Sequence, residues 1–132
     1  MPVSVKFEND GLGVLLSAHG IMKDNDFAEA NRIIYVPEVM TKLRYQIVDL
    51  TNIENVDTNW DKLRRLAETD KNAADEIPGL KIALIADGGV LEAMAQIYQR
   101  LAKHESLITR IFRNQQDARR WVADCVVMEA SA

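Results

Sequence analysis

Hydrophobic and polar positions alternate in short runs at the start of the chain. Val3, Val5 and Phe7 are apolar and the residues between them are polar, which is the two-residue period of a half-buried strand. A second apolar run covers residues 14–19 and is expected to end at Gly20. The intervening residues 9–13 contain an Asp-Gly pair, which favours a hairpin because glycine tolerates positive φ. Two antiparallel strands are therefore predicted here.

The remaining chain alternates between strand-like apolar runs and stretches with helical spacing. Residues 45–50, 80–86 and 107–112 are predicted strands, and the nearly continuous apolar run 80–86 is typical of a strand buried on both faces. Helices are predicted between and after these strands, because apolar residues recur there every three or four positions. Their buried stripes comprise Phe27, Ala30, Ile33 and Ile34; Trp60, Leu63, Leu66 and Ala67; Val90, Met94, Ile97 and Leu101; and Ala118, Trp121, Val122 and Cys125.

The resulting order, ββαβαβαβα, predicts an α/β sandwich with a five-stranded mixed, largely parallel sheet flanked by about four helices. The 132 residues contain no linker or internal repeat, so a single domain over residues 1–132 is expected. A loose C-terminal tail over residues 125–132 is left open. The polar stretch 69–76 is interpreted as the solvated end of a helix.

Composition narrows the class of protein. Sixteen Lys and Arg residues against twenty Asp and Glu residues give a net charge of −4. No basic stripe stands out, so no nucleic-acid partner is predicted. No apolar run approaches the roughly 20 residues of a bilayer span, and the first residues lack the apolar core of a signal peptide. A cytoplasmic protein that is not transmembrane is expected, and the lone Cys125 has no partner for an internal disulfide.

Two stretches resemble a known family. Residues 48–58, Val-Asp-Leu-Thr-Asn-Ile-Glu-Asn-Val-Asp-Thr, resemble the signature loop of STAS domains, in which Asp-Leu-Ser and a hydrophobic residue precede Asp-Ser-Ser-Gly. Residues 109–122 are similar to the closing strand and helix of the SpoIIAA-like proteins, which are STAS-related and are also compared with the CRAL-TRIO lipid-binding fold. The resemblance implies a bacterial, anti-sigma factor antagonist-like module without catalysis of its own. The chain departs from the pattern at Asn59-Trp60, where Ser-Gly is usual.

In regulatory members of this family, a partner kinase phosphorylates the first residue after the loop aspartate. The resemblance implies that this position corresponds to Thr58 in the present chain. A phosphate would be favoured there, since free N–H groups and the helix dipole attract negative charge at a helix start. The alternative is that Thr58, or Asp57 beside it, simply caps the following helix. In either case the predicted loop 52–55, with Asn55, is expected to form the surface that partners contact.

Asp49 and Asp57 stand on either side of this predicted loop. Two carboxylates in one loop would suit acid–base or metal chemistry. A loop aspartate that accepts hydrogen bonds from backbone N–H groups is the favoured interpretation. No histidine stands near them at ligand spacing, so no metal site and no cofactor are predicted.

A second candidate site is an apolar pocket. Trp60 is interpreted either as core or as the lip of such a pocket, His19 as a residue that lines it, and Met94 as an adaptable side chain suited to an irregular cavity. Similarity to CRAL-TRIO folds would make the occupant a lipid or another apolar molecule.

Three functional classes follow. The favoured one is a non-enzymatic regulatory or protein-interaction module, whose partner is a kinase or an anti-sigma-like regulator. The alternative is a small carrier of an apolar ligand. An enzyme is the least supported, since no arrangement of nucleophile, base and orienting group is recognisable. A homodimer is left open.

Overall fold

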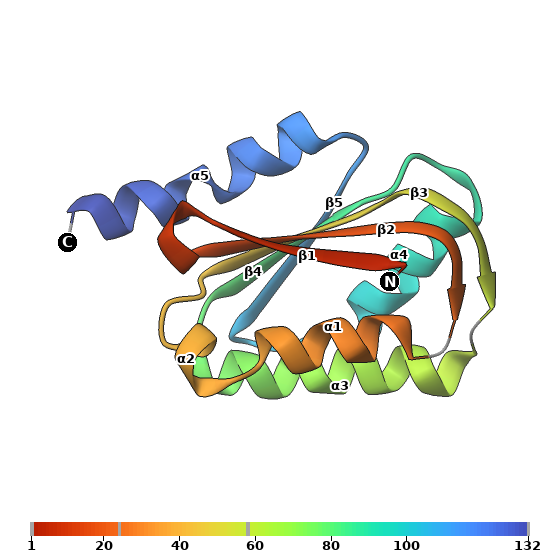
Figure 1. The fold of residues 1–132 in the computed structure, drawn as a ribbon, viewed down its shortest axis with the longest axis horizontal. Coiled ribbons are helices and arrows are strands. Elements are labelled where there is room, and N and C mark those ends of the chain that lie inside the picture. The colour runs from red at the N-terminus through yellow and green to blue at the C-terminus, as the bar shows by residue number, and fades with distance from the viewer. Residues whose placement is uncertain (1, 24, 58, 132) are drawn as a thin grey trace.

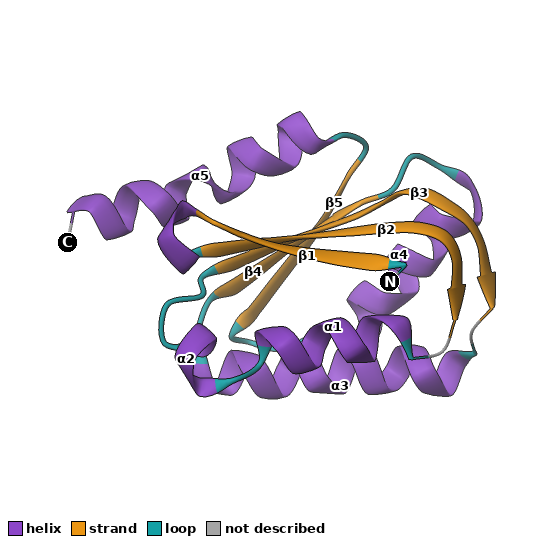
Figure 2. Ribbon diagram, in the orientation of Figure 1, coloured by secondary structure: helices purple, strands orange, loops and turns teal. Residues whose placement is uncertain are grey.

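The computed structural model describes residues 2–23, 25–57 and 59–131, and for residues 128–131 it describes the backbone alone. The described residues form a central sheet with helices on both faces (Figures 1 and 2). The strands are β1 (Val3–Glu8), β2 (Gly13–Lys23), β3 (Tyr45–Asp57), β4 (Leu80–Ile85) and β5 (Leu107–Phe112). The helices are α1 (Asp26–Ile34), α2 (Pro37–Met40), α3 (Trp60–Glu76), α4 (Gly89–Leu101) and α5 (Gln115–Ser131), and a short 3-10 turn, η1 (Asn9–Gly11), joins β1 to β2.

The sheet follows the order of the sequence, β1-β2-β3-β4-β5. β1 pairs antiparallel with β2, and every later pair is parallel, so the predicted mixed, largely parallel sheet is confirmed. Because each parallel strand lies beside the preceding one and such crossovers are right-handed, helices α1 to α4 all lie on one face. α5 follows the last strand and covers the opposite face (Figure 1).

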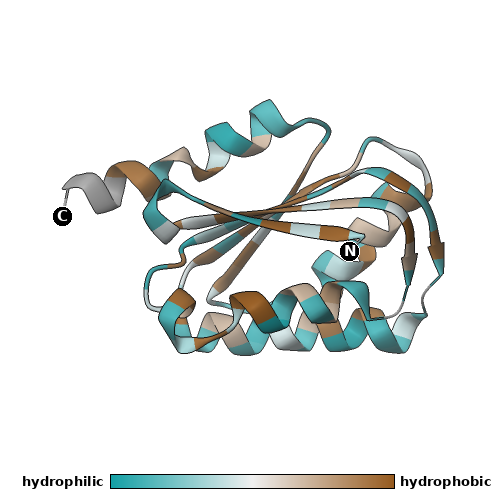
Figure 3. Cartoon of the chain, in the orientation of Figure 1, coloured by the Kyte–Doolittle hydropathy of each residue, from teal (hydrophilic) through white to brown (hydrophobic). Residues whose placement is uncertain are grey.

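Alternate side chains of the middle strands belong to two hydrophobic cores, one on each face of the sheet. In β4, Ile82 and Leu84 pack toward α1 to α4, whereas Ala83 and Ile85 pack toward α5. All four side chains are buried, as predicted for a strand covered on both faces. Figure 3 shows hydrophobic residues along the strands and hydrophilic residues along most of α3.

β2 and β3 are longer than the sequence pattern indicates. β3 continues through residues 51–57, and β2 continues past Gly20 to Lys23. The two extensions pair with each other, for example Met22 with Val56, and they bend together away from the rest of the sheet (Figure 1). The prediction of a loop over residues 52–55 is therefore wrong. Mutual backbone pairing holds these polar residues extended.

Two other expectations are corrected. The end of α3 is not simply solvated, because Asp70, Ala73 and Ala74 are buried. The suggested loose tail is helical instead, since α5 continues to Ser131. In α3 the polar composition conceals the buried face of the helix.

Gly13, the first residue of β2, allows a close approach on the α5 side. A Cβ atom there would lie 1.9 Å from Cζ of Tyr45, the first residue of β3. The Tyr45 ring is completely buried. Only glycine leaves room for this ring over the backbone of the neighbouring strand.

A cavity with one polar end

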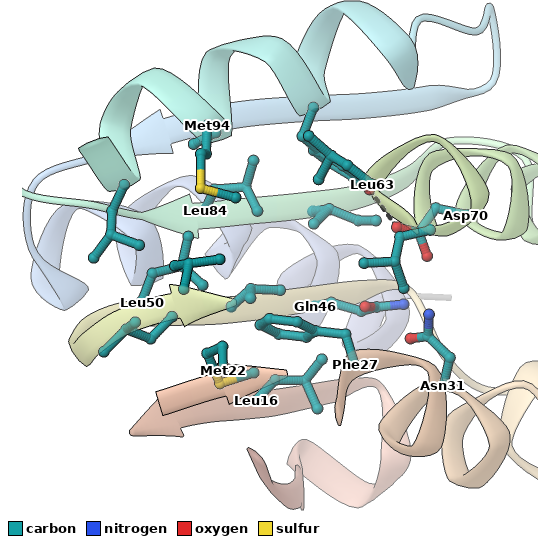
Figure 4. Close-up of a pocket in the computed structure, with 18 of the residues that line it drawn as sticks. Leu16, Met22, Phe27, Asn31, Gln46, Leu50, Leu63, Asp70, Leu84 and Met94 are labelled. Carbon is teal, nitrogen blue, oxygen red and sulfur yellow. Dashed lines mark hydrogen bonds between the residues drawn. The ribbon is translucent and has the colours of Figure 1, made fainter. Parts of the chain in front are cut away.

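An apolar cavity of about 120 Å³ lies between the sheet and helices α1, α3 and α4 (Figure 4). Apolar side chains from β2, β3 and β4 form its floor, and apolar side chains from the three helices form its roof. These side chains are Leu16, Met22, Phe27, Val48, Leu50, Ile53, Val56, Leu63, Leu66, Ile82, Leu84, Leu91, Met94 and Ala95. An apolar cavity of roughly 150 Å³ takes up benzene, so this space accommodates a small apolar group.

Four polar side chains meet at one end of the cavity. The Tyr35 hydroxyl donates to Oδ1 of Asp70 at 2.5 Å, and the Tyr98 hydroxyl donates to Oδ2 of the same carboxylate. Nε2 of Gln46 in turn donates to the Tyr35 hydroxyl at 2.7 Å. These residues come from the end of α1, from α3, from α4 and from β3. We call Asp70, Tyr35, Tyr98 and Gln46 the Asp70 cluster.

Asp70 is 7% exposed. Its burial raises the pKa from 3.8 to about 6, and the hydrogen bonds from the two tyrosines act in the opposite direction. Burial, together with the nearby Asp70 carboxylate, raises the pKa of Tyr98 and of Tyr35 well above 10, so both remain hydrogen-bond donors at neutral pH. Within the described residues, Asp70 forms no ion pair with a cationic side chain.

Asn31 of α1 lies at the same end. Its side chain lines the cavity and is 9% exposed, and Figure 4 shows it beside Gln46 and near Asp70. The Asn31 side-chain amide makes no hydrogen bond to any part of the chain that the structure describes. No fully buried side-chain nitrogen or oxygen of the described residues lacks a hydrogen-bond partner, so the Asn31 amide keeps accessible surface. Because Asn31 borders the cavity as well as an outer groove, its amide is available to a molecule bound at this end.

A surface groove of about 520 Å³ adjoins the cavity. The exposed side chains of Trp60 and Val90 border the groove but not the cavity. The outer end of the cavity therefore lies against the floor of the groove, away from Asp70. The two spaces share five side chains, which are Ile53, Val56, Leu63, Leu91 and Met94.

The structure separates the residues that the sequence assigned to a pocket. Met94 lines both the cavity and the groove. Trp60 borders the groove alone and is 57% exposed, so its assignment to the buried stripe of its helix is wrong. His19 is exposed on β2 and lines neither space, because its neighbour Ala18 takes the buried position on the cavity side.

The two carboxylates assigned to a loop are also apart. Asp49 and Asp57 lie eight positions apart on one extended strand, a span of about 26 Å, so they form no acidic pair. Asp49 accepts hydrogen bonds from the Thr51 N–H at 3.0 Å and the Thr51 hydroxyl at 2.6 Å, which confirms its interpretation as an acceptor of a backbone N–H. Nε2 of Gln115 on α5 donates to Oδ2 of Asp49 at 3.4 Å.

The start of α3 differs from the prediction as well. Asn59 caps this helix, accepting from the Lys62 N–H at 3.0 Å, in place of Asp57 or Thr58. Asp57 is exposed at the end of β3, and Asn55 borders the groove while its side-chain oxygen accepts from the Val56 N–H. Thr58, the proposed phosphoacceptor, lies outside the described residues.

The Asp70 cluster was not predicted from the sequence, although the sequence contains a signal for it. Asp70 follows Leu63 and Ala67 by seven and three residues, so it continues the apolar stripe of α3. Gln46 likewise stands within the apolar run of β3. A carboxylate or amide at such a position is buried and requires partners.

A second carboxylate cluster lies on the α5 face. Glu8 of β1 accepts two hydrogen bonds from the Arg119 guanidinium of α5, at 2.9 and 3.1 Å. The Tyr45 hydroxyl donates to Glu8 at 2.6 Å and accepts from Asn9 at 2.7 Å. Burial alone would raise the pKa of Glu8, but hydrogen bonds and charge from Arg119, with the bond from Tyr45, lower it below its ordinary 4.5. We call these residues the Glu8 cluster.

Among the described residues, no helix is long and apolar enough to cross a membrane, and no group of three or more His, Cys, Asp and Glu side chains is arranged to hold a metal.

No known protein-family model and no curated protein sequence matches this chain. Among solved structures, it is similar to an uncharacterized protein from the DUF3478 family with a SpoIIAA-like fold, from Shewanella loihica PV-4. The TM-score is 0.59 at 15% sequence identity, and the match covers 90% of each chain. The expected SpoIIAA-like fold is confirmed, and at this identity the likeness shows the fold alone.

Proposed function

We propose that this chain, a module with a SpoIIAA-like fold, binds a small molecule with an apolar body in the cavity above β3 and β4. The observation that carries the proposal is the combination of an apolar cavity with a buried polar end. Ligand sites have this composition, with mostly apolar walls and a few placed polar groups that orient the ligand. The chain then acts as a carrier or sensor and has no catalysis of its own.

A variant that fills the cavity tests this function. Ala95 lines the cavity and is 3% exposed, so Ala95→Leu places three more carbon atoms inside it. Ala123→Leu adds the same atoms at an exposed position of α5 and serves as the matched control. Native mass spectrometry of protein purified from its own host should show a bound small molecule for the wild type and for Ala123→Leu, and little for Ala95→Leu.

NMR titration with benzene gives an independent test of the same cavity. Benzene should shift the methyl signals of Met94, Leu84 and Leu50, and leave those of Ile85 unchanged. The proposal fails if the purified protein carries no bound mass and benzene shifts none of the cavity signals.

The groove favours a second candidate function, recognition by a protein partner in a regulatory system. Trp60 and Val90 are 57% and 73% exposed beside it, and Asn55 borders the same space. Exposed aromatic and aliphatic side chains around a groove are typical of interaction sites. Thr58 directly precedes Asn59, which borders the groove, so phosphorylation at Thr58 would add negative charge one residue away in the sequence.

Pull-downs test the second candidate with three variants. Trp60→Ser and Asn55→Arg change the groove, and Thr58→Glu imitates the charge of a phosphate. A kinase or anti-sigma-like regulator that binds the wild type should be lost with Trp60→Ser and with at least one of the other two. Identical partners for all four proteins would exclude both the groove and the switch.

A further inference from the structure

We infer that the ligand of the cavity is a primary amine with a short apolar body, whose ammonium group binds at Asp70 with its N–H donors shared among Asp70, Asn31 and Gln46. This inference rests on the proposed function, since it names the chemical class of the molecule in the same cavity.

The charge of the Asp70 carboxylate favours a cationic ligand. Asp70 is buried, and the described residues supply it with tyrosine hydroxyls but no cation. Buried carboxylates are normally paired with a positive group, because desolvation of an unpaired charge is unfavourable. The Glu8 cluster of the same protein shows the usual solution, in which an arginine supplies that group. An ammonium ligand would supply it at Asp70.

The polar end of the cavity retains hydrogen-bond acceptors that a ligand with several donors would use. Each Asp70 oxygen accepts one tyrosine O–H and retains a further lone pair. The Asn31 amide has no partner among the described residues, and the Gln46 side-chain oxygen has no donor there either. The vacant capacity therefore includes acceptors on three side chains, and an ammonium group carries three donors. A carboxylate ligand would instead be repelled by Asp70.

The volume of the cavity limits the size of the apolar body of the ligand. The cavity of about 120 Å³ accommodates a body of about six carbon atoms, and the adjoining groove gives room for a longer one. The Asp70 cluster lies at the end of the cavity away from Trp60, where Asn31 also borders an outer groove of about 430 Å³. The charged group of the amine would lie at this end, and its apolar body would extend toward Trp60.

Other charged groups near the site do not change this assignment. The titratable groups facing Asp70 are Tyr35 at the end of α1 and Tyr98 on α4, and Asn31 and Gln46 are neutral. Lys23 borders the cavity from the exposed end of β2. Arg32, Lys62 and Arg65 border the outer groove that also touches Asn31 and Tyr35, but none of the three forms an ion pair with Asp70 in the described part of the chain. Asp70 accepts a proton below about pH 6, whereas an alkylammonium stays charged like a lysine side chain. Amine binding should therefore weaken as the pH falls through that value.

Three probes with the same apolar body distinguish the classes: hexylamine, hexanol and hexanoate, titrated by calorimetry at about pH 8. Hexylamine should bind at least about tenfold more tightly than hexanol, because a hydrogen bond to a charged group is worth more than a neutral one. Hexanoate should bind least. At about pH 5 the affinity for hexylamine should fall about tenfold and that for hexanol should change little.

Two variants locate the effect. Asp70→Asn keeps the shape of the side chain and should abolish the preference for hexylamine over hexanol. Glu8→Gln, the matched control, alters the other tyrosine-bonded carboxylate and should leave the preference intact. Asn31→Leu breaks no hydrogen bond in the described protein and should also weaken hexylamine, which keeps the test decisive if Asp70→Asn does not fold.

The outcomes separate this inference from the function on which it rests. If hexanol or hexanoate binds as tightly as hexylamine at about pH 8, the cavity is a ligand site but the amine assignment is overturned. An undiminished preference for hexylamine in Asn31→Leu and Asp70→Asn would overturn it too. If none of the three probes binds and benzene shifts no cavity signal, the proposed function itself fails.

Discussion

Each face of the sheet holds a carboxylate that accepts a tyrosine O–H, and the two carboxylates lie in opposite charge environments. Glu8, under α5, is paired with Arg119, and its pKa is lowered. Asp70, under α1 to α4, accepts two tyrosine hydroxyls without a cation from the described residues, and its burial raises its pKa to about 6. Hydrogen bonds alone, even two of them, do not offset the desolvation of Asp70.

The packing around the two clusters also differs. The Glu8 cluster lies over a close-packed core in which the Tyr45 ring fills the space above Gly13. The Asp70 cluster lies at the end of a cavity, next to the Asn31 amide, which has no hydrogen-bond partner among the described residues. One face thus completes its polar contacts within the chain, and the other retains polar groups and volume for an additional molecule. The following predictions test this contrast.

The largest expected effect comes from truncating the two isoleucines of β4. Ile82 and Ile85 are each 1% exposed on opposite faces, so either change to Ala should lower the free energy of unfolding by about 2–5 kcal/mol. Urea denaturation measures the loss. Benzene should restore stability to Ile82→Ala, whose side chain lines the cavity, more than to Ile85→Ala. A loss below about 0.5 kcal/mol, typical of surface positions, would contradict burial.

The second prediction concerns the pH dependence of stability. The folded state binds the Asp70 proton more tightly than the unfolded state, so the free energy of unfolding should fall as pH rises from about 4 to about 6. The shift from 3.8 to about 6 corresponds to about 3 kcal/mol. In Asp70→Asn this component should be absent, as measured by urea denaturation across that range.

The contribution of Glu8 to the free energy of unfolding should change with pH in the opposite direction to that of Asp70. Its lowered pKa stabilises the fold above pH 4.5, and this contribution should be lost as the pH falls below that value. Glu8→Gln should cost about 1–2 kcal/mol at about pH 7, a moderate amount because the Arg119 side chain is 40% exposed. Equal pH profiles for Glu8→Gln and Asp70→Asn would refute the contrast between the two clusters.

The smallest expected effect is at the helix starts, where the two faces should behave alike. Asn59 caps α3 on the cavity face, and the Asn114 side chain accepts from the Asp117 N–H at 2.8 Å at the start of α5. Either change to Ala should cost about 1 kcal/mol by thermal or urea unfolding. A much larger loss at one of them would show that its role is not a local cap.

Local patterns were sufficient for most of the fold. The alternation in β1 and the continuous apolar run of β4 reflect burial that each side chain requires wherever the sheet forms. Pro37, which lacks a backbone N–H, separates α1 from α2 and is the first residue of α2. The limits of β2 and β3 were not predictable in this way. Residues 51–57 are mostly polar, and pairing with β2 supplies backbone partners that hold them extended.

Local sequence patterns predicted only part of the candidate site. Met94 was predicted as an adaptable side chain suited to an irregular cavity, and it lines the cavity. Trp60 and His19 have the composition of pocket residues but are exposed, because the start of a helix and the outer side of a strand do not face that cavity. Asp70 was interpreted as solvated, since nothing in a polar segment indicates which of its carboxylates will meet a tyrosine from another helix.

The sequence by itself therefore determined the element order and the two-sided burial of β4, because these depend on apolar periodicity within each segment. The SpoIIAA-like fold was expected from the resemblance of residues 48–58 and 109–122 to that family. The tertiary structure decided the site. Tyr35, Gln46, Asp70 and Tyr98 are as much as 63 positions apart in the chain and meet only when α1, α3 and α4 pack on one face of the sheet. Burial then changes the pKa of Asp70, and that change depends on neighbours that no local pattern specifies.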